Sequence, residues 1–582
     1  MSAKLPLAAP PAANTAIAIP LASQRSAPAE ERFFLLLSIF IGIYAGLAVV
    51  CFRLAIEWTR IYALGSSISV TGPRLILAPA IAGLVVAFLV MRVFPAVRGS
   101  GVNQTKSALY ISNGYIPLRT AIGKFICSAL AIGSGHSLGP EDPSLQIGAT
   151  LASALGRRLR LSREKTRLIA PVGAAAGLAA AFNAPISAVL FVIEEVIGRW
   201  SAGILGSIVL SAVSSVVVAR FFLGAEPMFR IPNVSLISTE ELLAYALLGV
   251  GGGIASLIFA KLIGFSRERL KAMPRWTQYV QPAIAGAIIG TIGYFGFPQI
   301  MGAGYEYMDQ AMHAQFTWQI LLALALLKIA ATTLSFTSGT PGGMFAPTLF
   351  VGAMLGAAAG DIEHILVPHL TGSVGTYALV GMGVLFAAFL RAPLTSVFMV
   401  LEVSGNYSII IPVILANTIA YLISRSLQPT PIFEVLTRQD GLILPSMEEQ
   451  RDADVLRVED AMRAYAGPTL ESDELADIAA ERASASPEPV LLVRRRAFNG
   501  WSYVRRETLR TAPPHSLVAH VLPEQPLPML FPDIALETAI RKVHGHDIVP
   551  VINRADPSKL EGVVTLDLVL RTFSEATEER FE

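Results

Sequence analysis

The chain has 582 residues, of which 53% are hydrophobic and only 15% are charged. Ordinary soluble domains carry about 25% charged residues, so this composition excludes a typical soluble protein. The net charge is +2, and no cluster of basic residues suggests nucleic acid as a partner. The composition therefore predicts a polytopic membrane protein.

Residues 1–32 are rich in alanine and proline and are predicted to form a disordered tail. They lack the basic start and compact apolar core of a signal peptide. Apolar runs that reach or approach the length of a bilayer span occupy 33–51, 75–94, 203–223, 242–264, 281–297, 317–336, 376–390 and 408–424. We predict a membrane block over 33–435, a linker over 436–454 and a separate soluble unit over 455–582.

The membrane block repeats itself. The segment 94–101 returns as 297–304, at an offset of 203 residues. A second set of positions recurs at an offset of 204: Lys124, Gly135, Gly139, Pro143, Gly148 and Gly156 match Lys328, Gly339, Gly343, Pro347, Gly352 and Gly360. A third set recurs at an offset of 208: Gly173, Ala184, Pro185 and Glu194 match Gly381, Ala392, Pro393 and Glu402. Paired Gly/Pro interruptions in two halves point to the binding site of a transporter.

The segment 133–148 lies between apolar runs, and it combines helix breakers with two carboxylates, Glu141 and Asp142. Ionisable groups at membrane depth are costly, which favours a functional role. Pro143 suits the first turn of a helix, whose free N–H groups and positive dipole end attract an anion. The segment therefore predicts an anion path with a titratable acid at its mouth.

Three loops carry a family resemblance: Gly99–Gly101, Gly139–Pro143 and Gly343–Pro347. In order and spacing they resemble the signature loops of the CLC family of chloride channels and chloride/proton antiporters, and the resemblance covers roughly 33–435. It implies an all-α polytopic membrane fold with two inverted repeats of broken and tilted helices. It also implies a homodimer in the lipid membrane, in which each subunit moves chloride, and in the antiporters protons, along its own path.

For the first loop, the resemblance implies that Ser100, beside Gly101, coordinates the central anion, and serine is typical of the chloride-selecting type. Glycine on either side lets backbone approach a ligand, and the hydroxyl donates a hydrogen bond. The alternative is a simple glycine turn between helices. The family usually continues with isoleucine and proline, whereas Val102 and Asn103 follow here.

For the third loop, the resemblance implies that the backbone N–H groups of Met344 and Phe345, after Gly343, cradle chloride. A plain helix start is the alternative. Phe433 stands where the family supplies a tyrosine to the central anion, so one hydroxyl donor is absent. A core aromatic is the alternative for Phe433.

Glu141 stands where the family places its gating glutamate. An ionised carboxylate can occupy an anion site at a helix N-terminus, whereas a protonated one can leave it to chloride. The alternative is an acid that only favours the helix dipole. Pro140 replaces an arginine and Asp142 replaces a glycine of the family pattern. We expect weaker anion attraction at the outer mouth, and a proton that Asp142 can share with Glu141.

Glu195 aligns with the internal proton-transfer glutamate of the antiporters, and a solvated helix end is the alternative. Its neighbour Glu194 has the repeat partner Glu402, which suggests a structural role. The sequence thus predicts chloride/proton antiport gated by a glutamate. A passive, voltage- or pH-gated chloride channel is the alternative, favoured by Phe433 and the altered second loop.

One motif points to another class. Residues 135–139 fit G-x-S-x-G, the nucleophile elbow of serine hydrolases, with Ser137 as nucleophile. That elbow requires a strand–turn–helix, whereas the flanks here are membrane helices and the repeat counterpart lacks the serine. A membrane serine hydrolase remains a remote alternative, and neither an enzyme nor a metal site is expected.

The soluble unit contains two weakly similar parts, the first opening at 456–462 and the second near His520. Residues 534–540 are predicted to form an amphipathic helix, and 548–552 and 560–565 strands. The unit resembles a CBS-domain pair, an α/β appendage that implies cytoplasmic termini. Such pairs often bind an adenine nucleotide through an acid that here is replaced by Leu568, with Asp567 one residue short. We expect no cofactor.

Overall fold

A computed structural model describes residues 27–65, 72–159, 161, 163–198, 202–229, 231, 238–368, 372–442, 444, 456–495, 500–513, 515–553 and 556–578. The chain forms two compact units, and the first ends at Leu444. In the described part the second unit begins at Leu456. Residues 1–26 of the predicted tail over 1–32, and most of the predicted linker, lie outside the described residues, whereas 27–32 belong to a helix.

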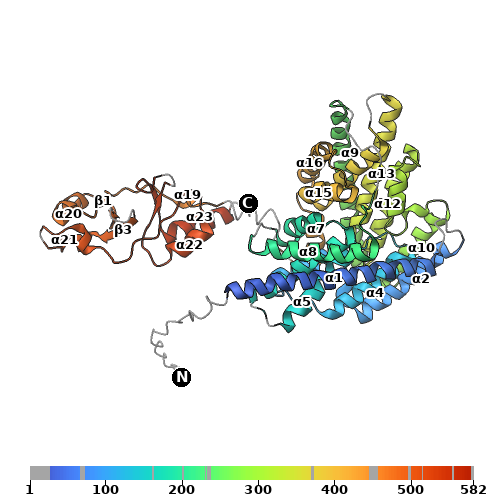
Figure 1. Cartoon of the computed structure of the whole chain (residues 1–582), viewed down its shortest axis with the longest axis horizontal. Helices are drawn as coiled ribbons and strands as arrows, with labels where there is room; N and C mark the ends of the chain where they lie inside the picture. Colours follow the sequence, from blue (N-terminus) through green and yellow to red (C-terminus); the bar gives the residue numbers. More distant parts are fainter. Residues whose placement is uncertain are drawn as a thin grey trace, which may run out of the picture. The chain divides into compact units, whose positions relative to one another are not determined.

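The described elements of the first unit are helices (Figure 1). In chain order they are α1 (Ala27–Ala63), α2 (Arg74–Phe88), η2 (Leu89–Val93), η3 (Pro95–Val97), α3 (Gly101–Tyr110), α4 (Leu118–Ser134), α5 (Glu141–Arg158), α6 (Arg163–Phe182), α7 (Pro185–Phe191), η4 (Val192–Ile197), α8 (Ala202–Leu223), α9 (Glu241–Ala272), η5 (Arg275–Tyr279), α10 (Gln281–Tyr294), η6 (Pro298–Ile300), α11 (Tyr305–Met312), α12 (Trp318–Thr337), α13 (Phe345–Leu366), α14 (Val374–Leu390), α15 (Pro393–Ser404), α16 (Ile410–Leu427) and α17 (Ile432–Gln439).

All eight predicted apolar runs fall on helices, and within the described residues seven helical stretches are long and apolar enough to cross a membrane. Helix α1 begins at Ala27, six residues before the predicted start of the membrane block, and α17 runs past the predicted end to Gln439. The early start of α1 is favoured by Glu30, an acid in its first turn. The prediction of a multi-pass membrane protein is confirmed.

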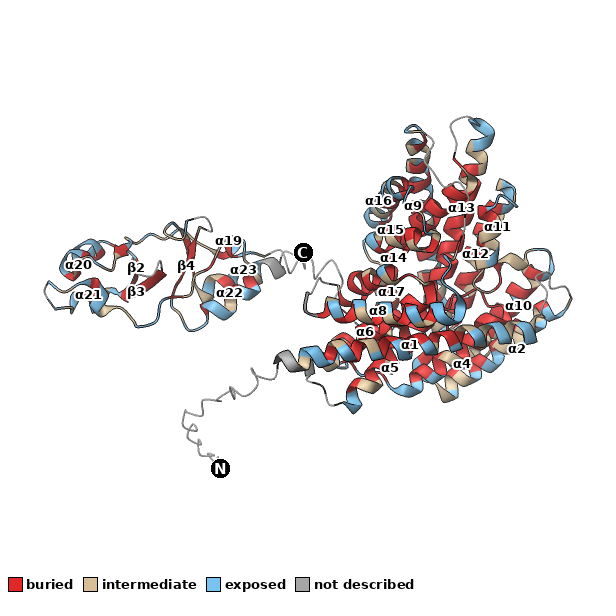
Figure 2. Cartoon of the chain, in the orientation of Figure 1, coloured by how far each residue is buried: buried red, intermediate tan, exposed pale blue. Residues whose placement is uncertain are grey.

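Burial differs sharply between helices. Every residue of α14 after its first, Val374, is buried, so this helix lies inside the unit (Figure 2). Helix α2, in contrast, exposes Leu77, Ile81 and Phe88. Apolar side chains are stable on such an outer face when lipid rather than water covers it.

The two sequence repeats make the same helix crossing. A Cβ added to Gly148 would lie 2.2 Å from the carbonyl oxygen of Gly173, and one added to Gly352 would lie 2.3 Å from that of Gly381. These contacts press α5 against α6 and α13 against α14. The glycines shared by the repeats are therefore the residues that allow the helices to touch.

The repeats also cap each other. Glu402 accepts hydrogen bonds from the N–H groups of Ile186 and Ser187 at the start of α7, at 2.9 and 2.8 Å. Glu194 accepts from those of Leu394 and Thr395 at the start of α15, at 3.2 and 2.9 Å. Each repeat thus gives the other the same contact, as a twofold relation between them requires. The fold is the predicted one, with two repeats of broken helices.

The second unit contains two small α/β halves. Its elements are α19 (Val458–Ala461), β1 (Leu470–Glu471), α20 (Ala476–Ser484), β2 (Val490–Arg495), β3 (Gly500–Arg505), α21 (Arg506–Arg510), η8 (Val518–Val521), α22 (Leu536–Val543), β4 (Val549–Ile552), β5 (Leu560–Val564) and α23 (Leu566–Glu578). The sheets have the orders β1-β2-β3 and β4-β5, with β2–β3 and β4–β5 antiparallel. Each half runs strand, helix, strand, strand, helix, if the single bridge at Leu530 counts as the first strand. This order agrees with the predicted CBS-type pair.

One predicted assignment within this unit is wrong. Residues 456–462 were expected to open the first half, but Val458 and Ala461 of α19 pack in the core of the second half, against Leu536 and Val549. The N–H group of Val458 also donates to the carbonyl of Ile534, at 2.9 Å. The apolar side chains of α19 are therefore buried by elements that follow it by about 80 residues, a pairing that no local pattern reveals.

Candidate functional site

The second and third signature loops are joined by their backbones. Gly139 and Gly343 exchange two N–H···O=C hydrogen bonds of 2.8 Å each, which form an isolated antiparallel bridge. Directly after this bridge, α5 begins at Glu141 and α13 begins at Phe345. Two helix N-termini, with amide groups that lack partners inside their own helices, are thereby fixed beside each other.

The Glu141 side chain is fully buried and lies across the start of α13. Its Oε2 accepts a hydrogen bond from the N–H group of Ala346 at 3.4 Å, while among the described residues its Oε1 has no partner. A Cβ on Gly139 would lie 2.2 Å from Oε2, so only glycine leaves space for the carboxylate. The acid predicted to gate the path thus sits on a helix N-terminus, where negative charge is favoured.

Asp142 points elsewhere. Its carboxylate lies at the start of α3, where Oδ1 accepts from the Ser100 hydroxyl and the Val102 N–H group, each at 3.0 Å. Oδ2 accepts from the Gly101 N–H group at 2.9 Å. The Asp142 carboxylate is therefore turned toward the start of α3 and not onto the helix N-terminus that holds Glu141, because successive residues at a helix start project in different directions.

Four of the six predicted anion-binding residues line one small cavity, and the other two, Gly101 and Gly343, do not. The cavity is lined by Ser100, Asp142, Phe336, Met344, Phe345, Leu390 and Phe433. The carbonyl oxygen of Phe433 accepts a hydrogen bond of 2.9 Å from the Asn103 side chain. Asn103, one of the two departures in the first loop, therefore fixes the segment that carries the phenylalanine. Neither Glu141 nor Glu195 lines this cavity.

A buried lysine supports the first loop of each repeat. Lys124 donates to the carbonyls of Val97 and Gly99, at 3.3 and 2.8 Å. Lys328 donates in the same way to the carbonyls of Ile300 and Gly302, at 3.0 and 2.8 Å. The lysines predicted to be equivalent thus hold equivalent backbone, and they place two buried cations close to the loops.

Glu195 lies in the π-helical stretch η4 and is 4% exposed, so it is not a solvated helix end. Its Oε1 is 3.2 Å from the ammonium of Lys106, a buried residue of α3. We did not predict a role for Lys106. Lys106 lies six residues after Ser100 among apolar segments, and this position could have indicated a buried cation that needs a carboxylate. Its partner Glu195 lies 89 residues away in sequence, so the pairing itself could not be predicted.

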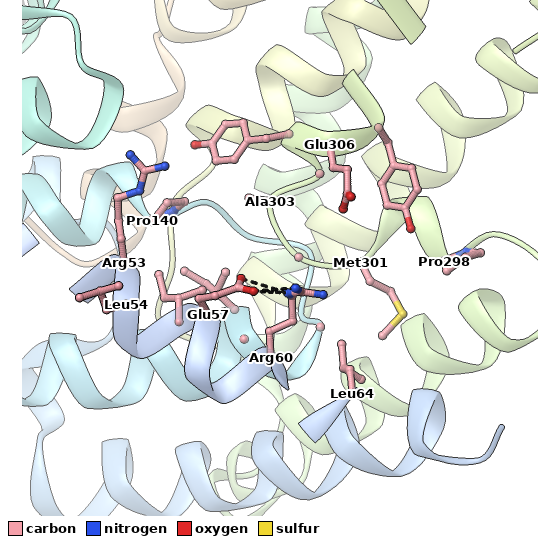
Figure 3. Close-up of a pocket in the computed structure, with 18 of the residues that line it drawn as sticks. Arg53, Leu54, Glu57, Arg60, Leu64, Pro140, Pro298, Met301, Ala303 and Glu306 are labelled. Atoms are coloured by element: carbon pink, nitrogen blue, oxygen red, sulfur yellow. Dashed lines mark hydrogen bonds and ion pairs between the residues drawn. The ribbon is translucent and has the colours of Figure 1, made fainter. Parts of the chain in front are cut away.

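Outside the Glu141 loop there is a larger cavity of about 470 Å³ (Figure 3). Pro140, Arg53 and Arg60 line it together with the acids Glu57 and Glu306. Arg60 is paired with Glu57 at 2.6 Å. Arg53, from α1, lies close enough to Glu141 to interact with it electrostatically. The cation predicted to be lost at Pro140 is therefore supplied from another helix.

The G-x-S-x-G segment has a different environment from a nucleophile elbow. Gly135 ends helix α4 in the left-handed conformation, with φ of 113°, and no strand leads into it within the described chain around it. The Ser137 hydroxyl is buried and lies 2.9 Å from that of Thr332, while His136 contacts the carbonyl of Pro79 at 3.1 Å. The serine is thus occupied in packing the two repeats together.

The family model described as "Voltage gated chloride channel" matches residues 82–425, more than half of the chain. A "Putative chloride channel protein ClcB-like" from Ralstonia nicotianae is 33% identical over 377 residues, which are 64% of this chain and 87% of the relative. An "H(+)/Cl(-) exchange transporter ClcA" from Salmonella paratyphi B is 32% identical over 418 residues, which are 69% of this chain and 87% of the relative.

The fold resembles a crystal structure titled a "slow cyanobacterial Cl-/H+ antiporter", with a TM-score of 0.65 and 24% identity. The match covers 72% of this chain and 99% of that one. Family model, relatives and fold agree with the three loops and the paired repeats. The chain belongs to the voltage-gated chloride channel family, the CLC family whose signature loops it carries.

Proposed function

We propose that the protein exchanges chloride for protons across a membrane, with Glu141 as the gate. The observation that carries this proposal is the buried Glu141 carboxylate at the N-terminus of α13, held by the Ala346 N–H group. An ionised carboxylate and chloride compete for one place there, and a proton decides between them. One side chain then links the two movements.

A second acid supports proton movement. Glu195 is buried and paired with Lys106, so a proton that reaches it changes a charge inside the protein. In this proposal Glu195 passes protons between Glu141 and the inner solution, and the residues around Ser100 and Phe433 form the inner part of the anion path. The Salmonella relative, whose name is that of an H(+)/Cl(-) exchange transporter, supports the same reaction.

The proposal includes assembly and orientation. We place the protein as a homodimer in a lipid membrane with cytoplasmic termini, because a separate α/β unit of CBS type follows the membrane unit. Apolar side chains exposed on α1 and α2, such as Phe40 and Ile81, support contact with lipid. Light scattering of the detergent-solubilised protein tests the dimer, and a monomeric mass contradicts it.

A passive chloride channel is the second candidate. It is favoured by Phe433, which lines the cavity without the hydroxyl that would hold a central anion. The Ralstonia relative, named a putative chloride channel protein, favours it too. A site that holds the anion weakly lets chloride pass without a matching proton.

Proton flux in proteoliposomes separates the two candidates. Vesicles containing the protein are placed in a chloride gradient at equal pH on both sides, and the external pH is followed. Exchange predicts that chloride flow drives protons uphill, whereas a channel passes chloride with no proton movement beyond the electrical leak. Vesicles without protein serve as the control.

A further inference from the structure

The position at Ser100 where a central chloride is expected is already occupied by a carboxylate of the chain itself. Asp142 is 2% exposed, and its two oxygens use the Ser100 hydroxyl and the N–H groups of Gly101 and Val102. These are the donors that would otherwise hold an anion at the start of α3, a helix of ten residues. Asp142 thus satisfies the donors as a bound anion would.

The charges around the cavity agree with this occupancy. The ammonium of Lys124 is fully buried and lies 4.0 Å from Oδ2 of Asp142. Buried cations need a nearby negative charge, whether from a side chain or from a bound anion. Here Asp142 supplies that charge, so the electrostatic attraction that Lys124 and α3 would exert on chloride is largely neutralised.

The second repeat shows what the same position looks like without an acid. The residue that corresponds to Asp142 at the offset of 204 is Ala346, which also follows a helix start by one residue. The N–H group of Ala346 donates a hydrogen bond to the Glu141 carboxylate instead. The carboxylates of Glu141 and Asp142 therefore lie at two different helix N-termini, those of α13 and α3.

We propose that Asp142 is a tethered ligand of the anion position at Ser100, and that chloride binds there only when the Asp142 carboxylate has left. Ser100 then positions Asp142 and does not select the transported anion. Selection among anions falls to the start of α13. This inference rests on the proposed function, because it takes chloride as the transported ion.

A purely structural ion pair between Asp142 and Lys124 makes the opposite prediction. If Asp142 only stabilises the fold, its removal leaves chloride affinity unchanged or lowers it. If Asp142 competes with chloride, its removal leaves three donors and the Lys124 ammonium without a carboxylate and raises the affinity for chloride. The two roles are therefore separated by a binding measurement on the full-length protein.

Isothermal titration of chloride into the detergent-purified protein provides that measurement. We expect Asp142→Ala and Asp142→Asn to bind chloride about tenfold more tightly than the unmodified protein, a change equivalent to about 1.4 kcal/mol. Asp142→Asn keeps the side-chain shape, so it decides the matter if the alanine variant fails to fold. Glu141→Gln, which frees the start of α13, is the positive control and is also expected to bind more tightly.

Two results would overturn the inference, and they are distinguishable. Unchanged or weaker binding in both Asp142 variants, with tighter binding in Glu141→Gln, removes Asp142 as a competitor but leaves the proposed function standing. An absence of chloride binding in every variant contradicts the proposed function itself, and this inference with it.

Anion selectivity gives an independent test. Ser100→Ala is expected to shift the ratio of nitrate to chloride flux less in the native background than in the Asp142→Ala background, because Asp142 occupies the donors for part of the time. In the Asp142→Ala background the same change is expected to shift the ratio at least about threefold, since coupled neighbours are not additive. Equal shifts in both backgrounds would show that Ser100 contacts the moving anion with Asp142 in place.

Discussion

The two repeats of the membrane unit share their backbone frame and differ in their acids. Each repeat has a lysine under its first loop, a glycine contact between two helices and a glutamate that caps the other repeat. The first repeat adds three carboxylates where the second has uncharged side chains: Glu141, Asp142 and Glu195 correspond to Phe345, Ala346 and Val403.

This difference separates two tasks. The shared features hold broken helices together, and they need the same residues in both repeats because the same backbone must be held. The unshared acids carry charge that can change or move. One repeat therefore provides the proton chemistry, while the other provides a helix N-terminus, that of α13, on which the first acid rests.

The largest effect is expected when the first repeat loses the acid that faces α13. Glu141→Gln is neutral, like its counterpart Phe345, so it neither takes up a proton nor competes as an anion. We expect proton flux driven by a chloride gradient to fall to the level of empty vesicles, while chloride flux continues with little pH dependence. Asp142→Asn is the matched control and should retain proton flux. Proton pumping by Glu141→Gln and its loss in Asp142→Asn would mean that the gating acid is Asp142.

Glu195 tests the second acid of the first repeat. Glu195→Gln keeps the shape beside Lys106 but removes the titratable charge. We expect proton flux to fall at least about a hundredfold, the lower end of the range typical of lost proton-transfer groups, while chloride flux is kept. Glu194→Gln controls for the neighbouring position. Equal loss of proton and chloride flux in Glu195→Gln would indicate a structural role for Glu195.

The paired lysines should differ in their contribution to stability. Lys124 lies 4.0 Å from a carboxylate, whereas no ion pair joins Lys328 to any carboxylate in the described chain, and its ammonium sits 4.7 Å from the Phe350 ring. Lys124→Met leaves Asp142 without its buried cation and should lower the free energy of unfolding by about 3 kcal/mol. Lys328→Met should lower the free energy of unfolding by less, because it leaves no carboxylate without its partner.

The lysine comparison is measured by thermal unfolding in detergent. Adding Asp142→Ala to Lys124→Met should recover part of the loss, because the unpaired charge is removed with its partner. Equal shifts for the two lysine variants, with no recovery in the double variant, would show that Asp142 and Lys124 do not interact.

The reciprocal caps should behave alike, with a difference set by burial. Glu194→Gln keeps one acceptor oxygen for the start of α15 but loses the charge, which should cost about 2 kcal/mol of unfolding free energy. Glu402→Gln, at the less buried cap, should cost less. Both losses of stability are measured from unfolding midpoints. We expect the folded variants to retain chloride flux. A large loss for Glu402 and none for Glu194 would contradict the twofold relation of the caps.

The smallest effect is expected outside the repeats, at an ion pair of the second unit whose arginine side chain is 39% exposed. The side-chain hydrogen bond from Arg463 to Glu488, at 2.9 Å, lowers the pKa of Glu488 below its ordinary value of 4.5. Because the pKa is lowered in the folded state, the stabilisation is present above about pH 4.5 and is lost as the pH falls through the folded-state value. Glu488→Gln should cost at most about 1 kcal/mol at pH 7.

The Glu488 difference should shrink as the pH falls below about 4.5, when the unfolding of the second unit is followed. A penalty that is the same at pH 7 and at pH 3 would mean that the charge of Glu488 contributes nothing. Together the last three comparisons rank a fully buried ion pair, two helix caps and a half-exposed ion pair by their contribution to stability.

The sequence predicted the backbone features well because they depend on residue types with fixed conformational meaning. Glycine and proline at constant offsets located both loops and the start of a helix near Pro143. Ser100, Met344 and Phe433 were expected to share a site, and they line one cavity. These positions follow a repeated pattern, so one half supports the prediction for the other.

Side-chain direction and distant partners could not be predicted. Asp142 was expected to act beside Glu141, yet one residue along a helix start turns the side chain by about 100°, toward α3. Lys106 interacts with Glu195, and Arg53 with Glu141, although the two residues of each pair are far apart in sequence. No local sequence pattern indicates either pair. Such contacts depend on how helices pack, which a single sequence does not specify.

Our central claim is that the first repeat fills two anion positions with its own carboxylates. Bromide, a heavy analogue of chloride, tests this claim directly. We would compare anomalous scattering from bromide-soaked crystals of Glu141→Gln with that of Glu141→Gln/Asp142→Ala. The first variant should show bromide at the start of α13 and none at Ser100, and the second should show bromide at both places. Bromide at Ser100 while Asp142 is present, or none there after Asp142 is removed, would contradict the claim.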